Sequence, residues 1–402
     1  MKVISINLCN YGSTGKIAYG ISEKAKENNI DYYVAYPMRK IGGQERENDI
    51  FITKKWVWNS LYCKFAKYTS LTGCYSHLHT FLFLRKLDEI KPDIMHLHNL
   101  HNSYINISML FRYIKKNSIK VVWTLHDCWA FTGHCPYFTM VKCNKWKEEC
   151  GNCAQLNIYP EITYDNTKWM LKKKKAWFSG VRNMIIVSPS RWLANLAEES
   201  FLNQYDIRVI NNGIDLNMFK PIESNFRQEH GIRDEEYMLL GVSFGWGKRK
   251  GLDVFVELAD SLSEKFKIVL VGTDELSEKN LPDNIITIRT TQNQKELAEI
   301  YTAADLFINP TREDNFPTVN IESLACGTPI VSFKTGGSTE IFDETCGVSV
   351  DVNDVEGLKR IIIDLCNNKP FSREQCINRA KMFDVKAKFT EYVDLYREVC
   401  RD

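Results

Sequence analysis

The segment from Asn309 to Val331, NPTREDNFPTVNIESLACGTPIV, contains a complete strand–loop–helix–strand unit. An apolar run ends at Asn309 and an acidic loop follows it. The spacing predicts a helix from about Pro317 to Cys326, with Gly327 as its stop and a new strand behind it. This alternation is typical of a parallel sheet covered by helices.

The same alternation runs along the whole chain. Short apolar runs predict strands at 3–8, 32–35, 94–98, 121–125 and 184–188, then at 238–242, 268–272, 285–288, 306–309 and 330–333. Two successive series predict an α/β chain with two Rossmann-like doubly wound domains facing a central cleft. Turn-forming residues between Asn211 and Pro221 mark the seam, which gives a first domain over 1–215.

Composition narrows the class of protein. The chain has 402 residues, 44% of them hydrophobic, and a formal net charge of +2, which excludes disordered, collagen-like and coiled-coil proteins. Residues 1–200 carry 28 basic and 16 acidic side chains, and the remainder is acidic overall, so the two halves are expected to have different partners. With no 18-residue apolar run and no signal-peptide pattern, the thirteen cysteines are expected to be reduced in a cytoplasmic protein.

The predicted helix at 317–326 begins at an anion-binding position. Free backbone N–H groups at Thr318 and Val319 suit a phosphate. Carboxylates at Asp314 and Glu322 bracket this start and suit sugar or ribose hydroxyls. The alternatives are that Asp314 only caps the helix and that Glu322 is a solvated surface residue.

This segment resembles the signature of glycosyltransferase family 4, retaining enzymes with the GT-B fold, found in surface-polysaccharide synthesis. The family has two Glu eight positions apart, and Asp314 and Glu322 have that spacing, with Glu313 as a second claimant. The resemblance implies that Asp314 is a catalytic-site carboxylate that holds the donor sugar and that Glu322 holds the ribose. It implies donor contacts from the backbone of four residues, Asn315, Phe316, Thr318 and Val319. It also implies a donor domain over 216–384 and a last helix, 385–402, that crosses back to the first domain.

A second donor anchor follows the strand at 238–242. The sequence Ser243 to Gly251, SFGWGKRKG, places three cations at a strand-to-helix loop, where they would neutralise a diphosphate. A solvated basic turn is the alternative. In the resembling family an Arg stands five residues before the Lys, and Gly245 occupies that position, so Lys248 or Arg249 would assist Lys250. Ser243 and Thr291 are further donor-side candidates by the resemblance.

The first half carries the acceptor-side candidates. The loop from Asn10 to Lys16 resembles a phosphate loop but has Ile17 where magnesium would need Ser or Thr. The resemblance places Gly15 beside the donor phosphate and His126, at a strand end, beside the transferred sugar. It also assigns three loop residues and one histidine to the acceptor side: Asn10, Tyr11, Gly12 and His101.

Cys135, Cys143, Cys150 and Cys153 fall within 19 residues. Four such thiols predict a structural zinc site, with free thiols or disulfides as the equal alternative. The resemblance implies that the segment, an insertion near 128–160, lies beside the acceptor site and that catalysis needs no cofactor.

Two segments are basic and aromatic. Residues 54–87 carry six cations and no acid, and 168–178 adds five Lys. Such segments favour an anionic membrane surface, and the alternative is core aromatics with solvated lysines. The charge has no base-reading motif beside it, so nucleic acid is not expected.

Taken with these features, the resemblance implies a retaining glycosyltransferase. It would move a sugar from a UDP- or GDP-type donor to a hydroxyl of a lipid-linked saccharide, peripherally bound at the inner face of the plasma membrane. The alternatives are a nucleotide-sugar epimerase of the same fold and a non-catalytic membrane-associated sugar-binding protein.

Overall fold

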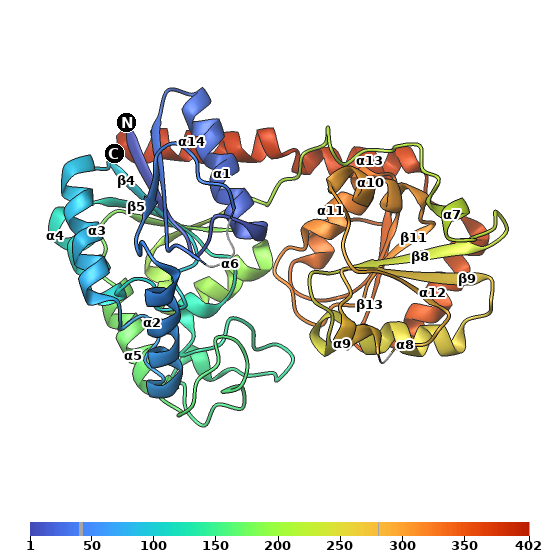
Figure 1. The fold of residues 1–402 in the computed structure, drawn as a ribbon, viewed down its shortest axis with the longest axis horizontal. Helices are drawn as coiled ribbons and strands as arrows, with labels where there is room; N and C mark the ends of the chain where they lie inside the picture. Colours follow the sequence, from blue (N-terminus) through green and yellow to red (C-terminus); the bar gives the residue numbers. More distant parts are fainter. Residues whose placement is uncertain (40–42, 280, 402) are drawn as a thin grey trace. The chain divides into compact units, whose positions relative to one another are not determined.

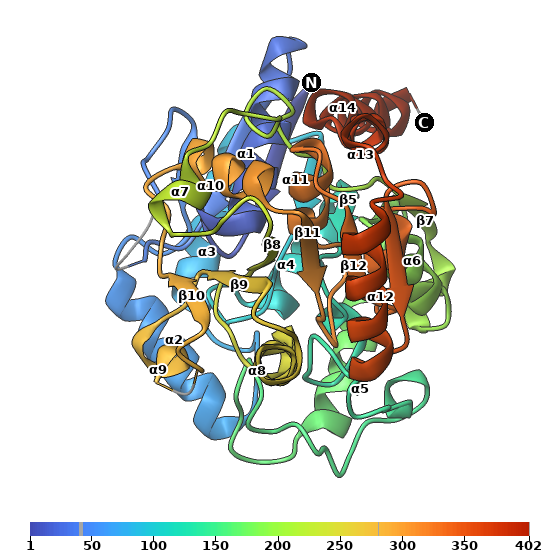
Figure 2. The ribbon, with the colours of Figure 1, turned by 90° about the vertical axis from the view of Figure 1, so that its right-hand side faces the viewer.

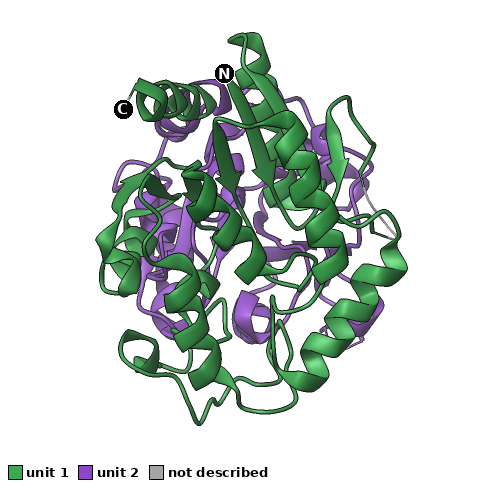
Figure 3. Cartoon of the chain, turned by 90° about the vertical axis from the view of Figure 1, so that its left-hand side faces the viewer, with its two compact units in different colours: residues 1–211, 388–402 green, residues 212–387 purple. Residues whose placement is uncertain are grey.

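The fold comes from a computed structural model that describes residues 1–402 apart from 40–42, 280 and 402. The chain divides into two compact units, coloured separately in Figure 3. Unit 1 contains residues 1–211 and 388–402, and unit 2 contains residues 212–387.

Unit 1 is built on a seven-stranded sheet in the order β3-β2-β1-β4-β5-β6-β7. Every neighbouring pair in it is parallel. The strands are β1 (Lys2–Ile6), β2 (Asp31–Tyr36), β3 (Asp49–Phe51), β4 (Ile94–Leu97), β5 (Lys120–Thr124), β6 (Met184–Ser188) and β7 (Asp206–Val209). The order of strands reverses between β1 and β4, and ligands of such sheets bind beyond the strand ends at this point.

Helices cover both faces of this sheet (Figure 1). They are α1 (Gly12–Glu27), α2 (Trp56–Thr69), α3 (His77–Ile90), α4 (Ile107–Asn117), α5 (Thr167–Phe178) and α6 (Arg191–Glu198). The apolar faces of α3, α4, α5 and α6 join the strands in one core that contains Trp123, Phe111 and Phe178. Between β5 and α5 the described chain forms only two short 3-10 turns, Trp129–Phe131 and Lys145–Lys147, in the region of the predicted insertion.

Unit 2 repeats the plan with six parallel strands in the order β10-β9-β8-β11-β12-β13. Figure 2 shows this sheet with β8 beside β11. The strands are β8 (Tyr237–Val242), β9 (Phe266–Val271), β10 (Ile285–Ile288), β11 (Leu306–Asn309), β12 (Ile330–Phe333) and β13 (Gly347–Val350). Its helices are α7 (Phe226–Glu229), α8 (Leu252–Ser261), α9 (Glu275–Glu278), α10 (Gln294–Ala303), α11 (Thr318–Ala325), α12 (Val355–Asn368) and α13 (Arg373–Ala380).

The last helix, α14 (Val385–Arg401), belongs to unit 1 from Lys388 onward. A Cβ at Gly20 of α1 would come within 2.0 Å of the Phe389 ring, so the absence of a side chain at Gly20 lets α14 pack against α1. Tyr396 of α14 is buried and contacts His96 in β4. The two chain ends therefore lie together, and Cys400 contacts Met1.

The two-sheet α/β architecture is confirmed. The strands at 184–188, 285–288, 306–309 and 330–333 match the predicted bounds, and the other predicted strands shift by one or two residues at one or both ends. Three strands were not predicted, namely β3, β7 and β13. All three lie at sheet edges, where one neighbour is missing and the apolar pattern is weaker.

Candidate functional site

The candidate donor site of unit 2 lies where its strand order reverses. β8 and β11 are neighbours in the sheet, and α8 and α11 follow them along the chain. The loop after β8 carries the three predicted cations, and the loop after β11 carries the predicted carboxylate. Residues distant in sequence are thereby brought to the ligand-binding edge of a Rossmann-like sheet.

Lys250 and Asp314 meet directly at this edge. Lys250 Nζ donates to Asp314 Oδ2 at 2.5 Å, and their side chains are 21% and 15% exposed. A positive and a negative group, both mostly shielded from water, are thus held together beyond the ends of β8 and β11. This arrangement can supply an ammonium to an anion and a carboxylate to hydroxyls at the same place.

Asp314 does not cap α11. Its Oδ1 accepts from the Asn315 amide at 2.9 Å, and the N-cap residue of α11, Pro317, has no side-chain cap bond. The half-buried residues Thr318 and Val319 form the first turn of the helix. The free N–H groups of a helix start are the feature that suits a phosphate.

Glu322 is half-buried on α11, and Tyr301 of α10 donates to its Oε2 at 3.2 Å. The alternative of a freely solvated surface residue therefore does not describe this carboxylate. Glu313, the second claimant, is only 4% exposed, and its carbonyl accepts from Arg249 Nη1 at 2.9 Å. Asp314 is more exposed than Glu313 and is therefore the better candidate for the carboxylate predicted to hold the donor sugar.

The other predicted donor residues lie around these loops. Ser243 is buried beyond β8, Thr291 is half-buried beyond β10, Asn315 is buried, and Phe316 packs in the core against Phe383. Only the backbone of Phe316 is thus available to a ligand. At Gly245 an added Cβ would meet nothing within 4 Å, so the position of the missing family Arg is open space. The Lys248 side chain is exposed and has no bonded partner among the described residues.

Sequence reasoning missed Arg312. Its guanidinium is buried between the two loops and pairs with Asp253 at 2.7 and 2.9 Å. These partners are 59 residues apart, so no local spacing could reveal them. The one available signal was a basic residue beside the acidic loop at a strand end.

In unit 1 the glycine loop between β1 and α1 lies at the corresponding reversal point. Asn10 exchanges two 3.0 Å hydrogen bonds with the backbone of Gly43, and Tyr11 is exposed. Gly12 has a positive φ of 68°, and a Cβ at Gly15 would come within 2.7 Å of the Asn10 backbone. The tight turn therefore requires both glycines.

His126 follows β5 and lies in a buried group of polar side chains. Its Nε2 is 3.0 Å from His98 Nδ1, while His101 Nε2 lies 3.4 Å from Asp127 Oδ2 and His101 Nδ1 lies 3.0 Å from the Tyr159 hydroxyl. Burial lowers the pKa of His126 to about 4, so its imidazole is neutral near pH 7. A neutral imidazole can donate to or accept from a sugar hydroxyl without carrying charge.

Asp127 stays ionised in this group. Burial raises the pKa of Asp127, but the neighbouring His101, with Nε2 3.4 Å from Oδ2, and the hydrogen bond from the Trp129 amide lower it by a larger amount, so the net shift is downward. His96 and His98 also lie close together, with ring centroids 4.1 Å apart.

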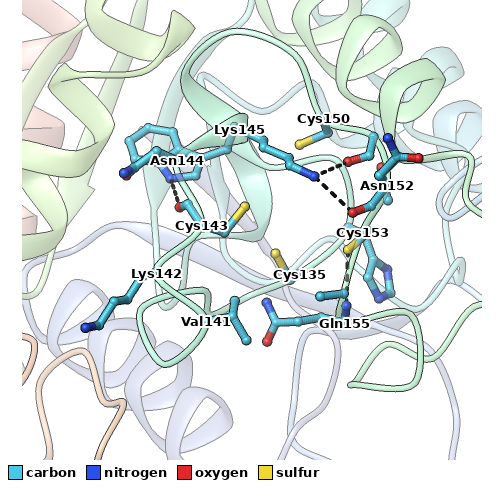
Figure 4. A pocket seen from close by; sticks show the side chains of 15 residues that line it. Cys135, Val141, Lys142, Cys143, Asn144, Lys145, Cys150, Asn152, Cys153 and Gln155 are labelled. Carbon is cyan, nitrogen blue, oxygen red and sulfur yellow. Dashed lines mark hydrogen bonds between the residues drawn. The ribbon is translucent and has the colours of Figure 1, made fainter.

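The four predicted zinc ligands line a cavity of about 270 Å³ in the insertion, and Figure 4 shows their sulfurs around it. The amides of Gly133 and Gln155 donate to the sulfurs of Cys150 and Cys153, at 3.3 and 3.5 Å. All four cysteines are free, and within the described residues no group of three or more His, Cys, Asp or Glu is arranged to hold a metal ion. The thiols suit zinc by type, and zinc binding stays a prediction.

The basic aromatic segments differ from one another. On α2 and α3 large apolar side chains are exposed, with Tyr68 and Leu78 each at 63%. On α5, by contrast, Lys174 is fully buried and donates to the carbonyls of Trp129 and Thr132. Lys168 and Lys172 are exposed, so solvated lysines describe only part of that segment. None of the described helices has the length and apolar content needed to cross a membrane.

Comparison with known proteins identifies the family. The model of Glycosyltransferase Family 4 matches residues 19–218, and that of Glycosyl transferases group 1 matches residues 223–383. The chain belongs to glycosyltransferase family 4. This membership places it among the transferases, and the two units are the paired Rossmann-like domains of the GT-B fold.

This chain is similar to WcaC of Escherichia coli (strain K12), whose name describes a colanic acid biosynthesis glycosyl transferase. The two are 24% identical over 278 residues, which span 66% of this chain and 65% of WcaC. It is also 22% identical to a 41.2 kDa protein in the cps region of Klebsiella pneumoniae, over 95% of this chain and 96% of that protein. Among solved structures, Anabaena Alr3699/HepE in complex with UDP has a TM-score of 0.70 at 14% identity, covering 99% of this chain and 100% of that one.

Proposed function

We propose that this family 4 glycosyltransferase transfers a sugar from a nucleoside diphosphate sugar to a hydroxyl group, with retention of the anomeric configuration. The observation that carries the proposal is the contact of Lys250 Nζ with Asp314 Oδ2 beside the uncapped start of α11. Solved structures of HepE with UDP and with UDP-glucose support a nucleotide-sugar donor.

In this proposal the diphosphate lies between the ammonium of Lys250 and the first turn of α11. Lys248 supplies the second cation, because its side chain extends free from the same loop and Gly245 leaves the family's usual position open. Cations and helix N–H groups stabilise the negative charge that develops on the leaving diphosphate. Asp314 accepts hydrogen bonds from the sugar hydroxyls, and Glu322 accepts them from the ribose.

In this proposal, His126 of unit 1 contacts the acceptor. Its neutral imidazole would hydrogen-bond the sugar or the attacking hydroxyl. We infer that the acceptor is a saccharide on the way to a surface polysaccharide, since the names of two of its relatives refer to colanic acid and to a cps region.

We further propose that the acceptor is lipid-linked and that unit 1 binds an anionic membrane surface. Exposed apolar residues on α2 and α3 lie among cations, and no acidic residue falls between 54 and 87. Such a surface can enter the headgroup region while its cations meet anionic lipid.

The test of the proposed reaction is product analysis with a panel of nucleotide sugars. A thermal-shift screen first finds the donor, because a ligand that binds the folded state raises its stability. Incubation with and without a saccharide acceptor then separates the alternatives. A transferase forms a glycoside only with acceptor, an epimerase releases an altered sugar without one, and a binding protein leaves the donor intact.

A further inference from the structure

Arg312 is a buried arginine whose guanidinium donates four hydrogen bonds. It is 9% exposed and lies in the loop between β11 and α11. Burying a guanidinium is costly unless its N–H groups are paired. Nη1 and Nη2 donate to the two carboxylate oxygens of Asp253 at 2.7 and 2.9 Å, and Nε donates to Asn353 Oδ1 at 2.6 Å.

The same arginine holds the backbone of the cation loop. Its Nη1 also donates to the carbonyl of Lys248 at 2.5 Å, and its own amide donates to the carbonyl of Arg249 at 2.8 Å. Asp253 lies in the first turn of α8, directly after the loop. One side chain therefore fixes the loop at its start and at the helix that follows it.

The two loops lie in direct contact. Gly251 has a positive φ of 78°, and a Cβ there would come within 2.5 Å of the Pro310 carbonyl oxygen. Arg249 Nη1 donates to the carbonyl of Glu313, which adds a second tie between them. Lys250 and Asp314 project from these tied segments, so the distance between their charged atoms depends on how the loops are held.

We propose that Arg312 is a positioning residue for the donor site. It holds the 248–250 loop against the 310–314 loop so that the ammonium of Lys250 stays in place for the diphosphate. Its own guanidinium is committed to Asp253, Asn353 and the Lys248 carbonyl, so it does not itself contact the donor. This inference rests on the proposed donor site at Lys250 and Asp314.

A purely structural role makes a different prediction. If Arg312 only stabilised unit 2, its loss would lower the melting temperature and leave the donor affinity of the folded fraction unchanged. A positioning role changes affinity as well, because a loop that samples other conformations binds with the competent fraction only.

The test measures binding of UDP and GDP by calorimetry, and KM and kcat for the donor, in the full-length protein. The variants are Arg312→Met, Arg312→Lys and Asp253→Asn. The matched control is Arg289→Met, since Arg289 is 58% exposed and, within the described part of the chain, its ion pairs are with Glu275 and Glu278 of the same unit.

We expect Arg312→Met to weaken diphosphate binding about tenfold or more and to raise the donor KM by a similar factor. Arg312→Lys, which keeps the charge but not the forked pairing, is expected to fall between Met and the natural residue. The Arg289→Met control is expected to bind like the natural protein.

The proposal would be overturned if folded Arg312→Met bound UDP and GDP as tightly as the natural protein and had the same donor KM. If that variant does not fold, the same result in Arg312→Lys and Asp253→Asn, judged folded by circular dichroism, overturns it. Lys250→Met separates the two proposals. If it too leaves binding unchanged, the donor site is wrongly placed, whereas a loss confined to Lys250→Met contradicts only the role of Arg312.

Discussion

Replacing Asp314 by Asn separates the two tasks assigned to the donor site. In the free protein Asp314 holds Lys250 at 2.5 Å, so a bound diphosphate must draw the ammonium away from this carboxylate. Asn keeps the side-chain oxygen that accepts from the Asn315 amide at 2.9 Å, and it replaces the charged oxygen that faces Lys250 by a neutral NH2 group. The substitution therefore leaves the loop intact and frees Lys250.

The substitution is expected to raise the affinity for the diphosphate and to lower the rate of sugar transfer. The Lys250–Asp314 pair is partly exposed, and breaking such a pair costs up to about 1 kcal/mol, so UDP or GDP is expected to bind up to about fivefold more tightly to Asp314→Asn. A hydrogen bond to a charged group contributes about 1.5–3 kcal/mol, so the transfer rate at low donor concentration is expected to fall roughly 10- to 100-fold.

Calorimetry with UDP and GDP and initial rates with the donor measure the two effects. Asp351→Asn is the control, because Asp351 is 80% exposed and pairs with Lys334 on the surface of the same unit. A parallel fall of diphosphate affinity and transfer rate in Asp314→Asn would refute the division of tasks.

Four further outcomes follow from the structure. Metal analysis of the purified protein is expected to give about one zinc per chain and much less in Cys150→Ser, while stoichiometry far below one in the natural protein contradicts the zinc prediction. Gly20→Val is expected to lower the free energy of unfolding by about 2–3 kcal/mol, because its Cβ would overlap the Phe389 ring, and urea melts check this. Burial lowers the pKa of Lys174 to about 7, below its unfolded value, so unfolding free energy is expected to rise with pH above about 7, and a slope unchanged in Lys174→Met would count against this cause. Flotation with phosphatidylglycerol vesicles, but not with phosphatidylcholine alone, is expected to recover the protein and to weaken in Phe81→Glu, whereas flotation indifferent to anionic lipid contradicts the membrane proposal.

The sequence predicted central strands well and edge strands poorly. Ile330–Phe333 is buried on both faces, so its apolar run is continuous and visible without any partner. Asp206–Val209 alternates charged and apolar residues and forms a strand only because β6 supplies its hydrogen bonds. A strand held by one neighbour depends on tertiary contacts that no local pattern records.

Prediction of the donor site from the sequence also stops where a residue's role depends on tertiary contacts. Asp314, Glu322 and Lys250 could be predicted because each lies in a short motif of recognisable spacing. Arg312 could not, because its role depends on Asp253 and on a backbone carbonyl more than fifty residues away. The sequence predicted that three cations lie in one loop. The structure was needed to show that Lys250 pairs with Asp314, whereas the Lys248 side chain is exposed.

The most direct test of the central claim is the fate of the anomeric centre. Time-resolved proton NMR of the donor, with saccharide acceptor or with water as a slow acceptor, reports the first-formed anomer before mutarotation. The account predicts a first product with the configuration of the donor, formed by the natural protein and strongly slowed in Lys250→Met. A first product of inverted configuration, or equal rates in the two proteins, would contradict it.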